Sequence, residues 1–306
     1  MGYFKNAVSC SIQLIKGCKK IAGNFTAWQV WRLFGYVLGF ILFYAPFALF
    51  HRLMVSVLNV NSSLTIHSFC LRIPIAHLLD GKIFHLNLPV ISLFLLSATA
   101  FFLGPLFCGR LCPAGAFTEY LSMIVPEKYK ITWMNYVPVL PIRYGFFLGF
   151  ILSSLWGGHL ACAYCNFYSF DLLINYISFG RITALSSSML LTFILWIVIL
   201  GIFTKGGRGY CCFFCPVGTL QSLIYALGRK ILPLHGALRI KKNNCQGCGV
   251  CASQCPMNAI RINDEGIAET NIYLCILCMN CVNKCPRNAI RYSIEGNGAG
   301  ANDQKF

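Results

Sequence analysis

Long apolar runs alternate with short basic loops over the first two thirds of the chain. Four of these runs approach or exceed the length of a bilayer-crossing helix, at about 33–57, 88–107, 143–160 and 184–203. The pattern predicts an α-helical integral membrane domain over 33–237 with four transmembrane helices. A basic segment, 1–32, precedes it and shows no convincing cleavage site for a signal peptide.

Composition and charge support the same interpretation. Hydrophobic residues make up 57% of the chain and charged residues only 11%, whereas a soluble domain carries about a quarter charged residues. The formal net charge of +16 is assigned to cytoplasmic loops rather than to nucleic-acid binding, because Lys and Arg gather before the first run, in the 108–143 loop and after the fourth run. The sequence therefore predicts a multi-pass protein of the cytoplasmic (inner) membrane with both termini in the cytoplasm.

The last quarter of the chain repeats one cysteine pattern. "CQGCGVCASQCP" begins at Cys245 and "CILCMNCVNKCP" at Cys275, each followed by Asn-Ala-Ile and a short strand-like segment. The "INDEGIAE" stretch between the copies predicts a hairpin. Zinc sites usually stop at four ligands in two pairs, which argues against zinc here. Residues 238–293 resemble the bacterial two-cluster ferredoxin, an α+β domain that holds two [4Fe–4S] clusters.

The resemblance also implies which cysteines bind which cluster. In that family the first three cysteines of one copy and the last cysteine of the other copy surround each cubane. The first cluster would accordingly have the ligands Cys245, Cys248, Cys251 and Cys285. The second would have Cys275, Cys278, Cys281 and Cys255. The tail, 294–306, is Gly-rich and polar and is expected to be disordered.

A second cysteine pattern, C-x3-C-P-x-G, occurs twice in the apolar part, at Cys108/Cys112 and at Cys211/Cys215. Proline suits the first turn of a helix, so Cys112 and Cys215 are expected at helix N-caps, where the helix dipole favours a thiolate. Internal symmetry of this kind places paired motifs side by side at a repeat interface. The four thiols could hold a further cluster, form redox-active disulfides or simply be buried packing residues.

Together the two patterns carry a more specific resemblance. Four predicted helices, two C-x3-C-P motifs and a C-terminal two-cluster ferredoxin resemble the NapH-type quinol dehydrogenase subunit, in a family that includes the NosR and CcoG types. The likeness covers about residues 30–293. It implies electron transfer from the quinol/quinone pool to a separate extracytoplasmic subunit, a ferredoxin, cytochrome or flavoprotein.

"HLACAYCNFYSF" departs from that family plan, because it adds Cys162 and Cys165 at the outer end of the third predicted helix. Three interpretations stay open. The pair could be a redox dithiol, could bind an extra cluster together with Cys70, or could be packing residues. Two cysteines spaced i and i+3 share one helix face, so both sulfurs can reach one ligand.

Quinol oxidation releases protons, and His or Asp side chains accept them well. His159, beside the cysteine pair, and Asp80 are the candidate catalytic residues on this basis.

The leading hypothesis is a membrane-bound iron–sulfur protein that oxidises quinol, or exchanges electrons with the quinone pool. One alternative reverses the flow and exports electrons from a cytoplasmic reductant to an outer thiol, flavin or cytochrome. Another is a metal-reducing assembly factor of CcoG type. No nucleotide fingerprint, phosphate loop or hydrolytic triad is present in the sequence.

Overall fold

The structure is a computed structural model of the 306-residue chain. It describes residues 27–44, 47–58, 71–79, 88–156, 160–180, 187–232 and 234–296. Of the residues expected to be functional, His159, Asp80 and Cys70 lie outside these ranges, as does nearly all of the tail expected to be disordered.

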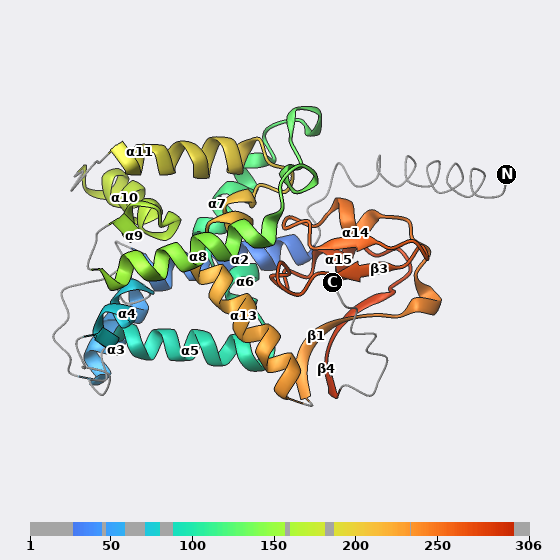
Figure 1. Cartoon of the computed structure of the whole chain (residues 1–306), viewed down its shortest axis with the longest axis horizontal. Helices are drawn as coiled ribbons and strands as arrows, with labels where there is room; N and C mark the ends of the chain where they lie inside the picture. The colour runs from blue at the N-terminus through green and yellow to red at the C-terminus, as the bar shows by residue number, and fades with distance from the viewer. Residues whose placement is uncertain are drawn as a thin grey trace.

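The chain folds into a helical part followed by a small α+β part (Figure 1). The helical part consists of α2 (Ala27–Phe43), α3 (Leu49–Leu58), α4 (Arg72–Leu79), α5 (Leu88–Leu103), α6 (Leu106–Arg110), α7 (Pro113–Ser122), η2 (Glu127–Tyr129), η3 (Trp133–Asn135), α8 (Val139–Leu155), α9 (Leu160–Ala163), α10 (Asn166–Phe179), α11 (Ser187–Phe193), the π-helical η4 (Ile194–Ile202), α12 (Gly209–Phe213) and α13 (Pro216–Ile231).

The α+β part consists of β1 (Leu234–Ile240), η5 (Lys242–Asn244), α14 (Val250–Ser253), β2 (Ile260–Ile262), β3 (Ala268–Thr270), α15 (Asn280–Lys284) and β4 (Ile290–Gly296). Strand β1 pairs antiparallel with β4, with Leu234 opposite Gly296 and Ile240 opposite Ile290. Strands β2 and β3 form the predicted hairpin. Along the chain, each cysteine copy lies between a strand of one ladder and a strand of the other.

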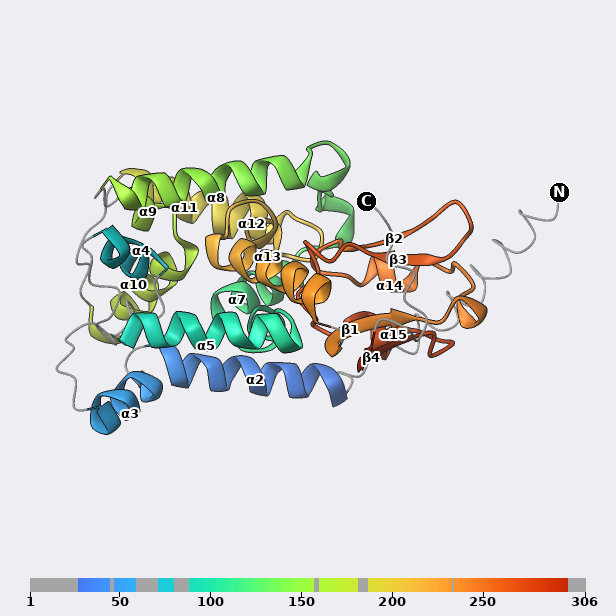
Figure 2. The ribbon, with the colours of Figure 1, turned by 60° about the horizontal axis from the view of Figure 1, so that its bottom comes forward.

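The helical part is built from two similar units. In each, a long apolar segment (α5, or α11 with η4) leads to a short helix (α6 or α12) and then to a helix that begins with Cys-Pro (α7 or α13). Figure 2 shows α8 along one side and α2 with α5 along the other, with α7, α12 and α13 between them. The second half of each unit therefore lies in the interior, which is where the cysteine motifs meet.

The helices are shorter than the apolar runs suggested. Helices α2, α5 and α8 have 17, 16 and 17 residues, and a membrane crossing takes about 20. Helix α5 ends at Leu103 because Gly104 adopts a left-handed conformation (φ +88°) and Pro105 follows it. None of the helices in the described ranges combines the length and apolar composition that crossing a bilayer requires.

The prediction of four transmembrane helices is therefore wrong, and so is the predicted multi-pass location in the inner membrane. The pattern predicts one helix for each apolar run, but the first run is divided between α2 and α3 and the fourth between α11 and η4. Apolar side chains such as Trp31, Phe94 and Leu148 are exposed on α2, α5 and α8. Apolar residues on both faces of short helices produced the hydropathy signal.

One buried apolar cluster runs through both parts of the molecule. It includes Phe43 of α2, Trp196 of η4 and Phe213 of α12, together with Leu277 and Met279 of the second cysteine copy. Leu277 is 1% exposed. The α+β part is thus packed into the helical core rather than attached by a linker.

Close backbone packing inside the helical part predicts a sharp difference between two glycines. A Cβ on Gly39 of α2 would lie 1.9 Å from the carbonyl oxygen of Leu111, whereas a Cβ on Gly149 of α8 would meet nothing within 4 Å. Gly39→Ala should lower the free energy of unfolding by about 2 kcal/mol or more, because backbone must move.

Gly149→Ala is the matched control and should raise the free energy of unfolding by about 0.5–1 kcal/mol, because alanine is the better helix former. Denaturant titration of both variants measures the difference. Equal stability of the two variants would contradict the packing of α2 against Leu111.

Candidate functional site

The two C-x3-C-P motifs adopt the same local structure. The first cysteine of each lies in a short helix, Cys108 in α6 and Cys211 in α12. The second, Cys112 or Cys215, is the N-cap of the next helix with proline at its first turn, which confirms the predicted capping positions. The backbone N–H of Gly218 donates to Cys215 Sγ at 3.4 Å. Helix N-termini supply such donors because their first N–H groups have no partner within the helix.

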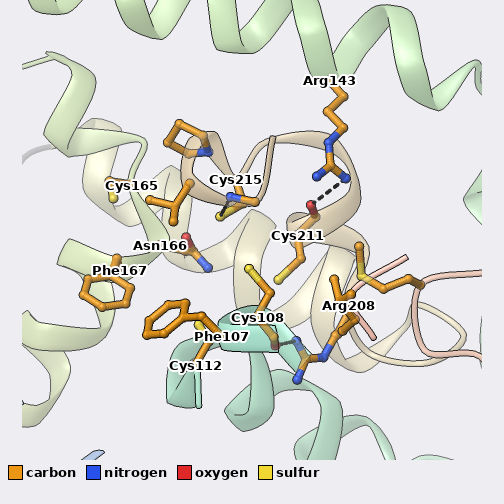
Figure 3. A pocket seen from close by; sticks show the side chains of 15 residues that line it. Phe107, Cys108, Cys112, Arg143, Cys165, Asn166, Phe167, Arg208, Cys211 and Cys215 are labelled. Carbon is orange, nitrogen blue, oxygen red and sulfur yellow. Dashed lines mark hydrogen bonds between the residues drawn. The ribbon is translucent and has the colours of Figure 1, made fainter. Parts of the chain in front are cut away.

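All four of these cysteines line one cavity, which Figure 3 shows with the sulfurs directed into the same space. Other residues on its wall are mainly apolar, among them Phe107, Val217 and Ile276. The fold thus brings together two motifs that lie about a hundred residues apart in the sequence. We call this group, Cys108, Cys112, Cys211 and Cys215, the four-cysteine site.

Two buried arginines flank the four-cysteine site in matching positions. Arg208 Nη1 donates to the carbonyl oxygen of Cys108 at 2.7 Å, and Arg143 Nη1 donates to the carbonyl oxygen of Cys211 at 3.4 Å. Their side chains are 1% and 2% exposed. Each arginine therefore fixes the backbone of one first cysteine and brings a positive charge to the cavity.

The Arg208 guanidinium is held by a buried carboxylate. Glu119 of α7 accepts from Arg208 Nε at 2.6 Å and from Arg32 Nη2 at 3.0 Å. Tyr36 accepts from both arginines, at 2.7 and 2.6 Å, and donates its hydroxyl to the carbonyl oxygen of Gly109 at 2.7 Å. Burial alone would raise the pKa of Glu119, but the two arginines outweigh burial and lower it.

Burial raises the pKa of every thiol in the four-cysteine site. The pKa reaches about 11 at Cys112 and about 12 at Cys211 and Cys215, and it also lies well above its usual range at Cys108. Neighbouring sulfurs reinforce the shift at Cys108, Cys211 and Cys215. Thiolate ligands must lose these protons when a metal binds, so binding of metal and release of protons are coupled here.

The donor set fits an iron–sulfur cubane. Four thiols come from two equivalent turns, the wall is apolar, and Arg143 and Arg208 offset negative charge. No three His, Cys, Asp or Glu side chains of the described residues converge closely enough to hold a single metal ion. A cubane takes one thiolate at each of its four irons, so its ligands surround a larger space than a single ion requires.

The α+β part contains the other two cysteine sets. A second cavity is lined by Cys245, Cys248, Cys251 and Cys285. The remaining set is Cys275, Cys278 and Cys281 with Cys255. Burial raises the pKa of Cys255, Cys275 and Cys281, and nearby sulfurs of the same set raise it further. The last cysteine of each copy accepts a backbone N–H, Ala259 to Cys255 Sγ at 3.2 Å and Ala289 to Cys285 Sγ at 3.3 Å.

The second of these sets lies against the four-cysteine site. Ile276 lines the four-cysteine cavity, and a Cβ on Gly109 would lie 2.1 Å from the Ile276 carbonyl oxygen. Met257, two residues after Cys255, also lines the cavity, and its Sδ lies 3.7 Å from Cys212 Sγ. No side chain fits between the two backbones at Gly109.

Cys162 and Cys165, the pair predicted at the end of the third helix, lie in different surroundings. Cys165 is the N-cap of α10 and lines the four-cysteine cavity. Cys162 lies in α9 and its Sγ is 3.4 Å from Arg72 Nη1. Only Cys165 of the pair therefore reaches the site predicted from the C-x3-C-P motifs.

The buried arginines and Glu119 were missed in the sequence. In the sequence, Arg143 belongs to the basic 108–143 loop and Arg208 to the basic residues that follow the fourth apolar run, and neither position indicates burial. The usable signal was a lone acidic residue, Glu119, within the apolar stretch "PAGAFTEYL". A charged residue in such a setting is rarely buried unless it is paired.

Comparison with known proteins agrees with the cysteine geometry. A family model described as "4Fe-4S binding domain" matches residues 84–132 and 188–235, the two C-x3-C-P units. A second, described as "4Fe-4S dicluster domain", matches residues 244–290. These matches support a ferredoxin-like iron–sulfur protein. The NapH type in particular remains a prediction.

Two curated relatives, both uncharacterized proteins of the archaeon Methanocaldococcus jannaschii, are similar to this ferredoxin-like chain. One is 28% identical over 168 residues, which is 53% of this chain and 63% of the relative. The other is 25% identical over 182 residues, or 59% of this chain and 62% of the relative. The chain thus covers less than two thirds of either relative. No solved structure matches the chain.

The Glu119 network predicts a large loss of stability when its charge is removed. Glu119→Gln leaves Arg32 and Arg208 buried without a counter-charge, which should lower the free energy of unfolding by about 3–5 kcal/mol. Glu127→Gln removes an exposed carboxylate paired with Lys130 and should change it by less than about 1 kcal/mol. Denaturant titration compares them, and a similar small effect in both variants would show that the buried network is not what stabilises α7.

Proposed function

We propose that this chain is an electron relay with three [4Fe–4S] centres, which exchanges single electrons between a quinol and a separate redox protein. Iron–sulfur electron transfer itself follows from the ferredoxin-like domains. The third centre, the quinol and the partner are the proposal. A bound cubane accepts and gives one electron at a time.

The observation that carries the proposal is the convergence of Cys108, Cys112, Cys211 and Cys215 on one apolar cavity. A purely structural role as buried core residues does not account for this convergence, because core cysteines have no need to direct their sulfurs into one cavity. Nor does a pair of disulfides account for the two buried arginines, which suit an anionic cluster. The four-cysteine site adjoins the Cys255–Cys275 set through Gly109 and Ile276. The four-cysteine site and the Cys255–Cys275 set thus border one buried apolar cluster.

The set around Cys245 lies at the end of the series that faces solvent. Its neighbours Lys242, Gln246 and Arg287 are exposed, and no described residue of this set belongs to the large apolar cluster that fills the helical part. A partner protein can approach this end directly. The basic side chains favour a partner with acidic groups around its own redox centre.

The quinol donor is proposed on the resemblance to the NapH type, in which quinol is the reductant. Quinol gives up two electrons and two protons, so a relay of one-electron centres suits it. The two candidate proton acceptors, His159 and Asp80, lie outside the described residues and keep that role as a prediction.

Iron content tests the third centre. Protein purified without oxygen should contain about twelve irons per chain if all three sites are filled, and about eight if only the ferredoxin sites are. Cys215→Ala should lower the count from about twelve to about eight, because one ligand of the four-cysteine site is lost. Iron and acid-labile sulfide assays measure both.

Cys212→Ala is the matched control for that experiment. Cys212 is buried next to Cys211 but does not line the cavity, so its removal should leave the iron count unchanged. A wild-type count of about eight, unchanged in Cys215→Ala, would rule out the third centre.

Electron donation from quinol is tested separately. A soluble quinol analogue should reduce part of the clusters of the anaerobic protein, seen as an EPR signal of the reduced state, and dithionite should give the full signal. A signal with dithionite but none with several quinol analogues would remove quinol from the proposal while leaving the relay intact.

A second candidate function reverses the direction of flow. In it, a low-potential reductant loads the exposed Cys245 end, and electrons leave at the opposite end of the series. The specific observation in its favour is Cys165, a further sulfur on the wall of the four-cysteine cavity that belongs to a C-x2-C pair.

A further inference from the structure

The turn that presents Cys165 is a third version of the turn that presents the four ligands. A short helix, α9, leads to an N-cap cysteine and then to the longer α10, as α6 leads through Cys112 to α7. The carbonyl of Cys165 accepts from Ser169 N at 2.9 Å, and that of Cys112 accepts from Ala116 N at 3.2 Å. The same local structure thus directs a fifth sulfur toward the cavity.

This fifth sulfur is surplus to a cubane. Four irons take four thiolates, and the C-x3-C-P motifs supply them as two equal pairs. Cys165 also differs from Cys112 and Cys215 in what precedes it. Its partner Cys162 is three residues earlier rather than four, and Asn166 stands where both motifs have proline.

Cys162 and Cys165 are placed to form a disulfide with each other. The backbone N–H of Cys165 donates to the Cys162 carbonyl oxygen at 3.1 Å, which closes a tight turn. Residues at the ends of such a turn have Cα atoms under about 7 Å apart, within reach of a disulfide. The two thiols are also near enough to interact electrostatically.

The two sulfurs have different surroundings. Cys162 is partly exposed and lies 3.4 Å from the Arg72 guanidinium, which stabilises a thiolate. Cys165 is directed inward to the cavity wall. Both cysteines are partly exposed, so the Arg72 guanidinium is what favours Cys162 as the attacking sulfur, while Cys165 borders the four-cysteine cavity.

We propose that Cys162 and Cys165 form a dithiol–disulfide pair through which electrons from the four-cysteine site reduce a disulfide substrate. The inference rests on the second candidate function, in which electrons leave at the end of the series near Cys165. Low-potential clusters can supply those electrons, because their reduction potentials lie in the range needed to reduce disulfides. It assigns the pair a substrate class, a disulfide of a small molecule or of a protein.

The chemistry balances as a thiol–disulfide exchange followed by two one-electron transfers. The Cys162 thiolate attacks one substrate sulfur, and the first substrate thiolate leaves with a proton from solvent. Cys165 loses its proton and attacks Cys162 Sγ, which forms the Cys162–Cys165 disulfide and releases the second substrate thiol. The Cys165 proton leaves with the second substrate thiol. Two electrons from the reduced iron–sulfur relay, with one proton from solvent, then restore the Cys162 thiolate and the Cys165 thiol.

Trapping experiments on the full-length, cluster-containing protein test the pair. The protein is reduced with dithionite, separated from excess reductant and mixed with oxidised glutathione without oxygen. Cys165→Ser should accumulate a mixed disulfide between Cys162 and glutathione, because the second attack is blocked. Cys162→Ser should form none. Mass spectrometry of alkylated peptides identifies the adduct.

Cluster re-oxidation supplies the second readout. Wild-type protein should re-oxidise with glutathione roughly tenfold or more faster than Cys162→Ser, and the Cys212→Ala control should match wild type. Iron content should be the same in all these variants.

Two outcomes would overturn the proposal. Iron loss in Cys165→Ser but not in Cys162→Ser would make Cys165 a cluster ligand instead. Full clusters that dithionite reduces, together with no adduct and an unchanged rate in Cys162→Ser, would remove the pair's redox role and leave the three-centre relay standing. A wild-type protein with only about eight irons would instead refute the relay from which the pair takes its electrons.

Discussion

The pairing of one buried carboxylate with two buried arginines is the interaction on which the helical part depends. Glu119 lies on α7, Arg32 on α2, and Arg208 at the start of α12, so the three charges connect elements from both repeat units. A buried charge without a partner is strongly destabilising, so the burial of each of these elements depends on the other two. Arg208 then extends the network to the Cys108 carbonyl, which links the stability of the fold to the position of a cysteine of the four-cysteine site.

Pseudo-symmetry explains why two arginines of different origin perform similar tasks. Arg208 precedes α12 and contacts the first motif, while Arg143 comes from α8 and contacts the second. Each donates to the carbonyl of the first cysteine of its motif, so the two halves of the site are oriented in the same way. The repeat is thus one of local backbone geometry, and the matching arginine comes from within the second unit in one case and from α8, outside both units, in the other.

Local patterns in the sequence were enough to predict what is local in the structure. The Cys-Pro dipeptides predicted the N-caps at Cys112 and Cys215, because proline restricts the first helical turn in any surroundings. The hairpin at β2 and β3 followed in the same way from turn residues and alternation. Hydropathy gave the wrong prediction of membrane-spanning helices, because the apolar character of a run does not show where the helix within it ends. Gly104 and Pro105 end α5 inside such a run.

The buried charges could not be placed from the sequence for a related reason. Arg143 and Arg208 carry no local sign of burial, and only their partners on distant elements make burial tolerable. Cys165 is a similar case, because its spacing differs from the C-x3-C-P motifs although its turn is the same. The third turn becomes visible only when α9 and α10 are compared with α6 and α7.

Gly109 lies where the helical part contacts the α+β part. Because its backbone touches that of Ile276 without an intervening side chain, the α+β part packs directly on the helical part and has no hinge at this contact. In the proposed relay, this contact would hold the four-cysteine site and the Cys255 set at one separation. The rate of electron transfer between them would then depend on the difference in their reduction potentials and not on a domain motion.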